Sequence, residues 1–278
     1  MQNILNKPLV AYVAYGPLGI EHLKKFIKNY EKYESGFEHD LLICFKNFSD
    51  YSKIQEWKKI ININFIEFYD REIKNDFDIG SYFRIAKKYS DRLIFFLGTY
   101  AAPIVRNWLK ILINNYEPKS VLGTMGSYAS MPSQFFNFYY NQYTKFQQIR
   151  WGLYHMIKVK LFPNPHIRTN GFMISAKDFL SLKYDRNKFV KKIETNYFEG
   201  GRFGMSNQLL SKGFKLFIVN SDNKKFDLDD WYKSDTYCLN HQEKLLFTDK
   251  RTNEYHLADT SEKKKLTKHT WGKYFKIS

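Results

Sequence analysis

A short apolar run, Leu93 to Leu97, ends abruptly in the small and polar residues Gly98-Thr99-Tyr100. Such a run is typical of a strand that is buried on both faces, as in a parallel sheet covered by helices. Pro103 then precedes a helix-like stretch, Ile104 to Tyr116, and proline suits the first turn of a helix. Open α/β sheets place their ligands at the carboxyl end of such a central strand.

The segments before and after this run repeat the same pattern. Apolar stretches of strand length alternate with segments whose apolar residues recur at helical spacing, such as Ile20 to Tyr33. This alternation predicts an α/β fold with a mostly parallel, Rossmann-like sheet and helices on both faces. The strands that we expect in the sheet are Leu9–Tyr15, Asp40–Phe45, Asn64–Tyr69, Leu93–Leu97 and Ser120–Met125.

The second half of the chain is less regular, and we expect it to form an irregular C-terminal part. Tyr139 to Leu161 is aromatic and basic, which suits helices and loops that cover one end of the sheet. His166 to Ser175 has the composition of a further strand, and Gly204 to Lys212 that of a helix. We therefore expect one domain over residues 1–256, followed by a basic tail over 257–278.

The formal net charge of +16 favours anionic partners such as nucleic acid, anionic lipid or phosphate-bearing substrates. The charge is dispersed and mostly lysine, so a solvated lysine surface is the alternative interpretation. Cys44 and Cys238 provide neither a disulfide framework nor a metal-ligand spacing, which favours a reducing cytoplasm. The chain shows no secretory signal and no apolar run of membrane-spanning length, so we expect a soluble or peripherally attached intracellular protein.

A series of short motifs resembles the GT-A glycosyltransferases, in particular bacterial enzymes that build capsule, O-antigen or related surface polysaccharide. The motifs are AYVAYG at Ala11–Gly16, DIGSY at Asp78–Tyr82, FFLGTYAAP at Phe95–Pro103, VLGTMGSY at Val121–Tyr128, PHIRTNGFMI at Pro165–Ile174 and FEGGRFGMSNQLLSKGF at Phe198–Phe214. The resemblance extends from residue 7 to residue 256. It implies a GT-A-like fold and the transfer of a sugar from a nucleotide-sugar donor to an acceptor.

The resemblance also implies that the donor binds over the carboxyl ends of the first strands. Tyr15 and Gly16 would then flank the base. Asp78, Gly80 and Ser81 would begin a helix, where an acidic side chain and free backbone amides can hold ribose or phosphate. A plain helix N-cap is the alternative role for Asp78. The donor site would be completed by Gly98, Thr99 and Tyr100.

The chain departs from the family pattern after the fourth expected strand. Typical GT-A enzymes carry an Asp-x-Asp there, whose carboxylates hold a divalent metal against the donor diphosphate. This chain has Gly98-Thr99-Tyr100, which provides no carboxylate. We therefore expect no required cofactor, with Lys and Arg side chains neutralising the departing diphosphate and with Mn or Mg as the alternative.

A direct-displacement transferase needs a carboxylate that takes the proton from the acceptor hydroxyl. By the resemblance, Glu199 is the candidate base and Arg202 a candidate phosphate or acceptor contact; a surface Glu-Arg pair is the alternative. His166, Arg168 and Asn170 alternate along the expected strand and would share one face, forming a polar wall for donor or acceptor. A lone histidine is more often structural than catalytic. Asp249 would belong to the acceptor side.

The function that we expect is that of an inverting glycosyltransferase acting on a saccharide or lipid-linked saccharide acceptor in bacterial surface-polysaccharide synthesis. The basic, aromatic-punctuated segment Lys263 to Lys276 would rest on anionic lipid at the inner face of the cytoplasmic membrane. The alternatives are a non-catalytic carbohydrate-binding or scaffold protein on the same fold and, on charge alone, a basic nucleic-acid-binding protein. We expect no nucleic-acid partner.

Overall fold

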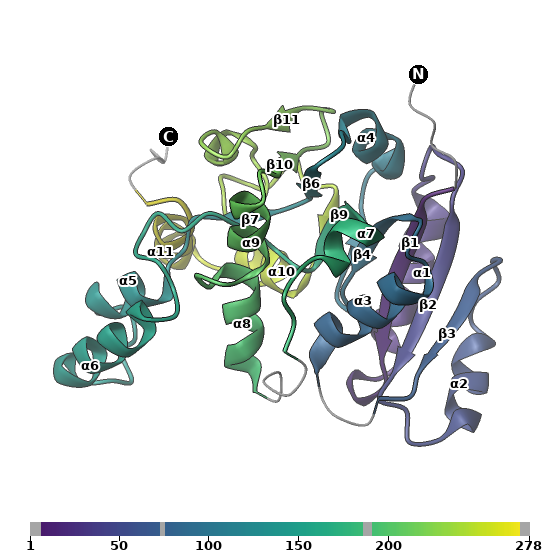
Figure 1. Ribbon diagram of the computed structural model, residues 1–278, viewed down its shortest axis with the longest axis horizontal. Helices are drawn as coiled ribbons and strands as arrows, with labels where there is room; N and C mark the ends of the chain where they lie inside the picture. The colour runs from purple at the N-terminus through teal and green to yellow at the C-terminus, as the bar shows by residue number, and fades with distance from the viewer. Residues whose placement is uncertain (1–6, 73–75, 186–190, 273–278) are drawn as a thin grey trace.

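The computed structural model describes residues 7–72, 76–185 and 191–272, and it centres on an eight-stranded sheet (Figure 1). The strand order is β11-β10-β6-β9-β4-β1-β2-β3. β9 and β11 run antiparallel to their neighbours, and the remaining pairs are parallel. The strands are β1 (Leu9–Tyr15), β2 (Asp40–Lys46), β3 (Ile66–Asp70), β4 (Leu93–Leu97), β6 (Ser120–Gly123), β9 (Gly171–Ser175), β10 (Lys215–Val219) and β11 (Lys225–Phe226). The predicted mostly parallel α/β sheet is confirmed.

β4 occupies the centre of the sheet, between β1 and β9, as the apolar run predicted. Phe95 and Phe96 are both fully buried and point into different halves of the core, because successive side chains of a strand leave opposite faces of the sheet. The same alternation places Val13 of β1 in one half of the core and Tyr12 in the other. The carboxyl end of β4 therefore lies in the interior of the fold.

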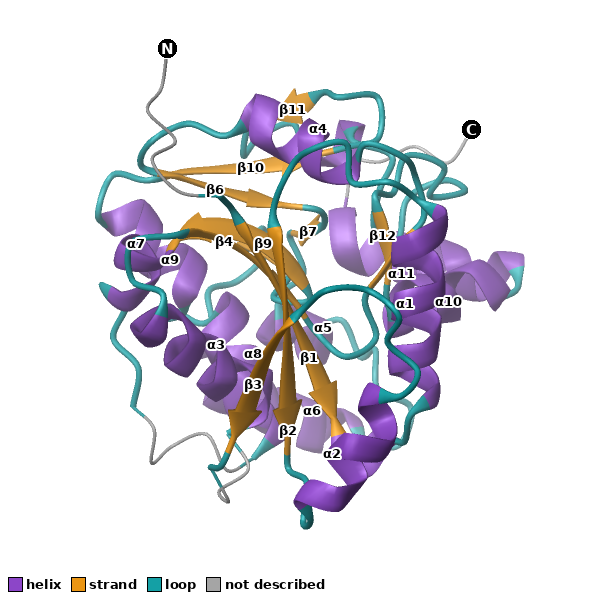
Figure 2. Cartoon of the chain, turned by 90° about the vertical axis from the view of Figure 1, so that its right-hand side faces the viewer, coloured by secondary structure: helices purple, strands orange, loops and turns teal. Residues whose placement is uncertain are grey.

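Helices cover both faces of the sheet (Figure 2). One face is covered by α3 (Phe77–Lys88), α7 (Ala176–Leu180), α8 (Lys192–Gly200) and α9 (Met205–Ser211), which contribute Tyr82, Phe179, Phe198 and Leu209 to the core. The other face is covered by α1 (Glu21–Lys32), α2 (Tyr51–Lys58) and α4 (Trp108–Asn115), which contribute Phe26, Ile54 and Trp108. Burial of these apolar side chains on both sides explains why the central strands are almost entirely apolar.

The remaining elements lie at the edges of this sandwich. Two short sheets pair β5 (Ala102–Pro103) with β12 (Phe247–Thr248) and β7 (Gly126–Ser127) with β8 (His166–Ile167). The short helices η1 (Gly16–Leu18) and η2 (Trp231–Lys233) lie in loops. The further helices are α5 (Met131–Phe136), α6 (Lys145–Met156), α10 (Lys250–Leu257) and α11 (Thr260–Trp271). α5 and α6 project away from the sheet, at the lower left of Figure 1.

Two predicted elements are wrong. The helix expected from Ile104 begins only at Trp108, because the backbone at 102–104 pairs with 246–248 instead, and Ile104 N donates to Leu246 O. The strand expected over His166 to Ser175 is broken into β8 and β9, since the first part pairs with β7 and the second with β4 and β6. His166, Arg168 and Asn170 therefore do not alternate along one strand.

The C-terminal segment is packed against the domain as far as the structure describes it. Within the expected basic tail, Thr260–Trp271 form α11, and Trp271 is fully buried, with its indole nitrogen donating to Tyr237 O at 2.9 Å. Residues 273–278, the end of the expected lipid contact, lie outside the described residues. None of the helices in the described ranges has the length and apolar character needed to cross a membrane.

Candidate functional site

The turn Arg168–Asn170, between β8 and β9, joins two groups of predicted site residues. It lies at the carboxyl end of β4, because Gly171 pairs with Leu97 and Gly98 N donates to Asn170 O at 3.1 Å. On one side, Asn170 Nδ2 donates to Asp249 Oδ2 at 2.6 Å. On the other side, Arg168 Nη1 lies 3.5 Å from Glu199 Oε2. Residues predicted from separate motifs thus meet at this turn.

Glu199 and Arg168 line a pocket of about 430 Å³ next to this turn. Glu199 Oε1 accepts a hydrogen bond from Thr169 N at 2.8 Å, so both carboxylate oxygens are oriented by the turn. The Arg168 guanidinium lies 4.9 Å from the centre of the Tyr237 ring, which also lines the pocket. The Glu199 side chain is 12% exposed, so its carboxylate is largely desolvated but still reachable from the pocket.

Arg168 and Arg251 both line this pocket, and Arg168 is the one that contacts Glu199. Burial is the largest single influence and disfavours the cation, but the charges of Glu199 and of the other acidic groups around it together outweigh burial and raise the pKa of Arg168 above its ordinary value. Its Nε is buried and has no hydrogen-bond partner among the described residues. A charged donor that lacks a partner beside a pocket is suited to an anionic or hydroxyl-bearing ligand.

His166 lines the same pocket, but its contacts are structural. Its Nδ1 lies 2.8 Å from Asn164 O, and burial lowers the pKa of the imidazole. Gly200 lies against this ring: a Cβ at that position would be 3.0 Å from His166 Nδ1. The missing side chain at Gly200 therefore makes room for the imidazole.

Arg202 is not brought to the pocket. Its Nε donates to Met156 O at 3.1 Å, and its backbone N donates to Lys158 O, so it lies beside the end of α6. Among the described residues Glu199 pairs with Arg168, so the alternative of a Glu199–Arg202 surface pair is wrong.

Asp249 is fully buried at the N-terminus of α10, where it forms a capping box with Thr252. Its Oδ1 accepts from Thr252 N at 2.8 Å, and its Oδ2 accepts from Asn170. With both oxygens engaged, Asp249 orients the Asn170 amide. The Oδ1 atom of Asn170 then faces Gly98, where a Cβ would lie 3.2 Å from it.

Asp78 faces Gly98 from the first turn of α3, and the same Cβ position is 3.2 Å from Asp78 Oδ2. Asp78 as a residue is partly exposed, but its carboxyl group is surrounded by protein, and no hydrogen bond from the described residues reaches it. Burial raises the pKa of Asp78 to about 6, although the charges of Lys192 and Lys46 oppose that rise. A carboxyl group without a hydrogen-bond partner and with a pKa near neutrality, at the carboxyl end of a central strand, is a candidate functional group.

Gly80 and Ser81 are not free to hold a donor. Ser81 Oγ donates to Asp70 Oδ2 at 2.6 Å, and a Cβ at Gly80 would lie 1.8 Å from Asp76 Oδ2. Both residues belong to a buried network of charged side chains at the start of α3. Its other members are Lys46, Asp70, Asp76 and Arg84. This network was missed from the sequence, although Lys46 and Asp70, charged residues that end apolar strands, were a signal for it.

The other predicted donor residues lie at the carboxyl ends of β1 and β4. Tyr15 hydroxyl accepts from Asn47 Nδ2 at 3.2 Å, and Gly16 lies against Asn47 O, where a Cβ would be at 3.0 Å. Thr99 O accepts from the Tyr12 hydroxyl at 2.6 Å. The Tyr100 ring packs on His22, and Lys250 Nζ lies 5.9 Å from its centre. The parallel sheet therefore brings these residues to one edge.

Within the described ranges, no group of three or more His, Cys, Asp or Glu side chains is placed to share a metal ion. Asp76 has the spacing to join Asp78, but its carboxylate is occupied by Lys46 and Arg84. The oxygens that face Gly98 are those of Asp78 and Asn170, which are of the type that Mg and Mn prefer. The protein alone thus provides a partial ligand set for such an ion.

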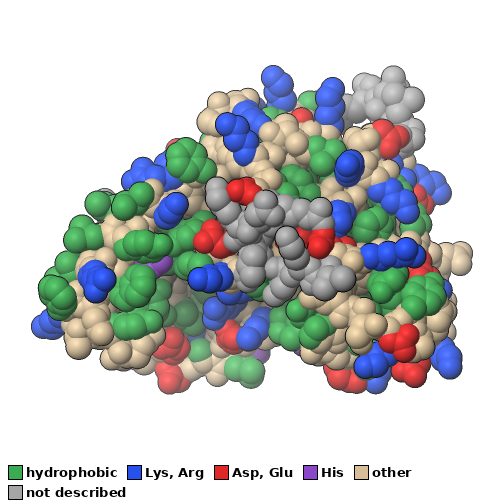
Figure 3. Space-filling model, turned by 60° about the horizontal axis from the view of Figure 1, so that its bottom comes forward, with side chains coloured by type: hydrophobic (Ala, Val, Ile, Leu, Met, Phe, Trp, Pro, Cys, Tyr) green, Lys and Arg blue, Asp and Glu red, His purple; other side chains and the backbone are tan. Residues whose placement is uncertain are grey.

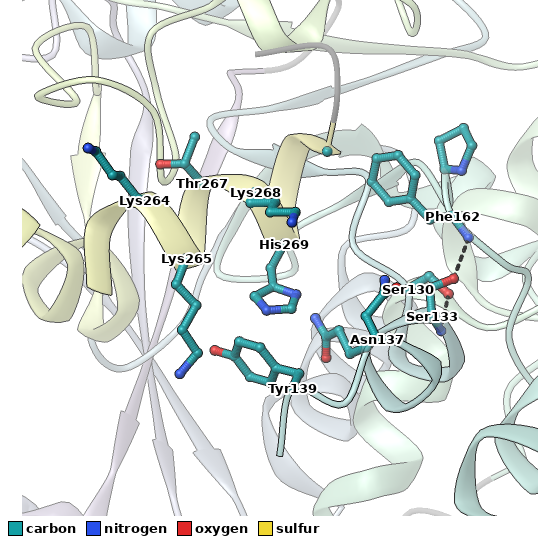
Figure 4. Close-up of a pocket in the computed structure, with 13 residues that line it drawn as sticks. Ser130, Ser133, Asn137, Tyr139, Phe162, Lys264, Lys265, Thr267, Lys268 and His269 are labelled. Atoms are coloured by element: carbon teal, nitrogen blue, oxygen red, sulfur yellow. Dashed lines mark hydrogen bonds between the residues drawn. The ribbon is translucent and has the colours of Figure 1, made fainter. Parts of the chain in front are cut away.

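A larger cavity, of about 1220 Å³, lies between α5 and α11 (Figure 4). Lys264, Lys265 and Lys268 line it, together with His269 and Tyr139. No carboxylate of the described residues lines it, so the smaller pocket, and not the larger one, is the candidate site for acid–base chemistry. The two cavities are neighbours, because Tyr139 and His269 line both.

No protein-family model and no curated protein matches the chain. Solved structures with a similar fold include HddC from Yersinia pseudotuberculosis, with 13% identity, a TM-score of 0.40 and coverage of 82% of this chain and 97% of that one. The galactosyltransferase LgtC, in complex with donor and acceptor sugar analogs, has 13% identity, a TM-score of 0.42 and coverage of 77% and 73%. Core-mannan synthase A from Aspergillus fumigatus, in its Mn/GDP form, has 9% identity, a TM-score of 0.40 and coverage of 77% and 72%. At these values the similarity does not assign the chain to a family or an activity.

Proposed function

We propose that the protein is a glycosyltransferase that moves a sugar from a nucleotide-sugar donor to a saccharide or lipid-linked saccharide acceptor. The observation that carries the proposal is the Arg168–Asn170 turn at the carboxyl end of β4. Asp78, a carboxyl group without a hydrogen-bond partner in the described residues, lies on one side of it, and the pocket with Glu199 lies on the other. Donor and acceptor would meet across this turn.

On the acceptor side, Glu199 takes the proton from the attacking hydroxyl. The Thr169 amide and Arg168 hold its carboxylate in place, which reduces the cost of orienting the base. Attack from the side opposite the leaving group inverts the anomeric centre. Arg168 lies on this same side, beside Glu199, where its guanidinium can donate to hydroxyls of the acceptor.

On the donor side, the nucleotide lies over the carboxyl ends of β1 and β4. Tyr15 and Gly16 flank the base, and Asp78 accepts hydrogen bonds from the ribose or sugar hydroxyls. Gly98 leaves the space between Asp78 and Asn170 that a Cβ would fill. We propose that Lys and Arg side chains, and not a divalent ion, balance the diphosphate.

The cellular role that we propose is bacterial surface-polysaccharide synthesis at the inner face of the cytoplasmic membrane. The support is the order of the sequence motifs, together with the net charge of +16, which suits an anionic surface. A lipid-linked acceptor would bring the enzyme to that surface.

A thermal-shift screen against UDP, GDP and their sugar derivatives, with and without EDTA, tests the proposal. A ligand at 100 times its dissociation constant adds about 2.7 kcal/mol to the free energy of unfolding, so a nucleotide that binds should raise Tm measurably. We expect a shift that persists in EDTA, followed by sugar transfer to a saccharide acceptor with the same donor. A shift that needs Mn or Mg would overturn metal independence, with Asp78 and Asn170 the ligands to test. No shift with any nucleotide would contradict the function itself.

A further inference from the structure

The outer face of α6 is apolar, which is the reverse of an ordinary surface helix. Phe146, Ile149, Leu153 and Ile157 follow one another at helical spacing along it, with exposed fractions of 77%, 44%, 53% and 69%. Other exposed apolar side chains surround this stripe, namely Phe138, Tyr143, Trp151, Tyr154, Leu161 and Phe203. We call this whole set the α6 patch. Figure 3 shows hydrophobic side chains gathered at this end of the molecule.

The inner face of α6 is already used for packing. Gln148, Gly152 and His155 are buried on the side of α6 that faces α5, with which it forms the α5–α6 hairpin, and a Cβ at Gly152 would lie 2.5 Å from the Phe136 ring of α5. The helix therefore cannot turn its apolar stripe inward without losing these contacts. Contiguous apolar surface of this kind on a folded protein marks an interaction site.

The stretch of chain that carries most of the α6 patch is basic. No Asp or Glu occurs between Glu117 and Asp178, whereas Lys145, Arg150, Lys158 and Lys160 lie in or beside the patch. Arg202 adds a further cation, because its contacts with Met156 and Lys158 place it and the neighbouring Phe203 at the end of α6. An apolar helix face with Trp and Phe, in a segment whose charged residues are all Lys and Arg, has the composition of a helix that lies in an anionic membrane interface.

We propose that the α6 patch inserts into the headgroup and upper acyl region of a bilayer that contains anionic lipid. α6 has 12 residues and spans about 18 Å, so it would lie in the interface and not cross it. A second copy of this chain is a poorer occupant, because two-fold pairing of the same surface would place these cations against one another.

Docking through the α6 patch would bring the candidate site close to the lipid, because segments next to α6 line its pocket. Gln134, Tyr139 and Tyr140 of the same hairpin line the pocket that contains Glu199. The lysine-lined cavity beside it adds positive charge at the base of the hairpin, where Lys265 lies 4.4 Å from the centre of the Tyr139 ring (Figure 4). The entry of a lipid-linked acceptor at this point rests on the proposed function. The membrane contact of the α6 patch does not depend on that function.

The test is vesicle sedimentation of the full chain with phosphatidylglycerol-containing and with pure phosphatidylcholine vesicles. We expect binding to the former that weakens with salt. Leu153→Ser combined with Ile157→Ser should lower the partition coefficient at least about tenfold, since each side chain loses apolar burial in the bilayer. Leu257→Ser, on α10, is the matched control, because Leu257 is 84% exposed but lies outside the α6 patch. Both variants should keep the wild-type Tm.

Trp151 reports insertion directly. It is 42% exposed, whereas Trp108, Trp231 and Trp271 are fully buried and the partly buried Trp57 lies on α2, outside the α6 patch. Brominated lipid should quench the fluorescence of the wild type, and Trp151→Phe should remove most of that quenching.

Absence of binding to anionic vesicles, or binding that the double variant leaves unchanged, would overturn the proposal. Concentration-dependent dimerisation that the double variant abolishes, without vesicle binding, would assign the patch to a second copy instead. Turnover with a water-soluble acceptor should be unaffected by the double variant, which separates this test from that of the proposed function.

Discussion

One carboxylate oxygen of Glu199 accepts a hydrogen bond from the Thr169 amide, and the other lies beside the Arg168 guanidinium. A substitution that keeps the first contact therefore tests the negative charge of Glu199 apart from its hydrogen bonding. Glu199→Gln keeps an acceptor for the Thr169 amide but removes the proton acceptor. Because general-base assistance is typically a factor of roughly 10²–10⁴, we expect turnover to fall by that order while the donor dissociation constant changes little. Steady-state kinetics and donor titration measure the two effects.

Glu194→Gln is the matched control, since Glu194 is also on α8 but is not among the residues that line the pocket. Its turnover should stay at the wild-type level. Loss of donor binding in Glu199→Gln would make Glu199 a binding residue. Normal turnover would place the base elsewhere. Asp249 is a poor substitute because both its oxygens are engaged, which leaves Glu254, the other carboxylate that lines the pocket, as the next to change.

Asp78 predicts an unusual dependence of stability on pH. The folded state raises its pKa from 3.8 to about 6, so between these values the native protein binds more protons than the unfolded chain. Stability from this group is therefore lost as pH rises from about 4 to about 6. Asp78→Asn should increase the free energy of unfolding at pH 8 by on the order of 2 kcal/mol, with the difference vanishing near pH 4. Urea denaturation at both pH values measures this.

If Asp78 also binds the donor, Asp78→Asn should raise the free energy of unfolding and lower the donor affinity at the same time. Donor affinity in the wild type should rise as pH increases through about 6, because the ionised carboxylate is the stronger acceptor for a hydroxyl. The variant should lack this dependence. A variant that is more stable but binds the donor normally at every pH would remove Asp78 from the donor site.

At the scale of elements, the start of α3 is held to the ends of β2 and β3 by buried charges. Lys46 Nζ lies 2.5 Å from Asp76 Oδ1, and Arg84 contacts both Asp70 and Asp76 at 2.5 and 2.6 Å. Burial alone would raise the pKa of both aspartates, but the hydrogen bonds from Arg84 and the charge of Lys46 outweigh it and lower them below 3.8. This stabilisation is present above about pH 4 and is lost as the pH falls below that value.

Lys46→Met tests the network, because removal of one partner leaves buried charge without compensation. We expect the free energy of unfolding at pH 7 to fall by about 3–5 kcal/mol. Lys24→Met is the matched control: Lys24 pairs with Glu21 on an exposed helix face, where an ion pair contributes roughly 0–1 kcal/mol. Equal effects of the two substitutions in chemical denaturation would show that the buried network adds nothing beyond a surface pair.

At the scale of the whole molecule, the structure separates two surfaces with different chemistry. The carboxyl edge of the sheet gathers Asp78, Gly98 and Asn170 from three segments distant in sequence. The α5–α6 hairpin carries the α6 patch, in an acid-free stretch of the chain. The pocket with Glu199 lies between them and takes lining residues from the hairpin and from α8. Under the proposed function, the donor would reach this site from the solvent and the acceptor from a membrane surface.

The sequence alone determined the sheet of the first half. Leu9–Tyr15 and Leu93–Leu97 have the bounds predicted for them, and the ends of the other expected strands move by only a few residues. The reason is that apolar runs of strand length, separated by helical spacing, have few other ways to be buried. The placement of Gly98-Thr99-Tyr100 at the carboxyl end of the central strand followed from the same pattern.

The tertiary structure decided which polar residues meet. The break between β8 and β9 depends on two different partner strands, which local sequence does not encode, and it turns Arg168 toward Glu199 and Asn170 toward Asp249. The sequence predicted a ligand-binding helix start at Gly80 and Ser81. In the structure Ser81 donates to Asp70 instead, and the Asp76 carboxylate fills the space beside Gly80. These long-range contacts form only once the strands and the helix are assembled. The outward apolar face of α6 could not be predicted from its aromatic, basic sequence either. Only the packing of Gly152 against Phe136 shows which face of the helix is left exposed to solvent.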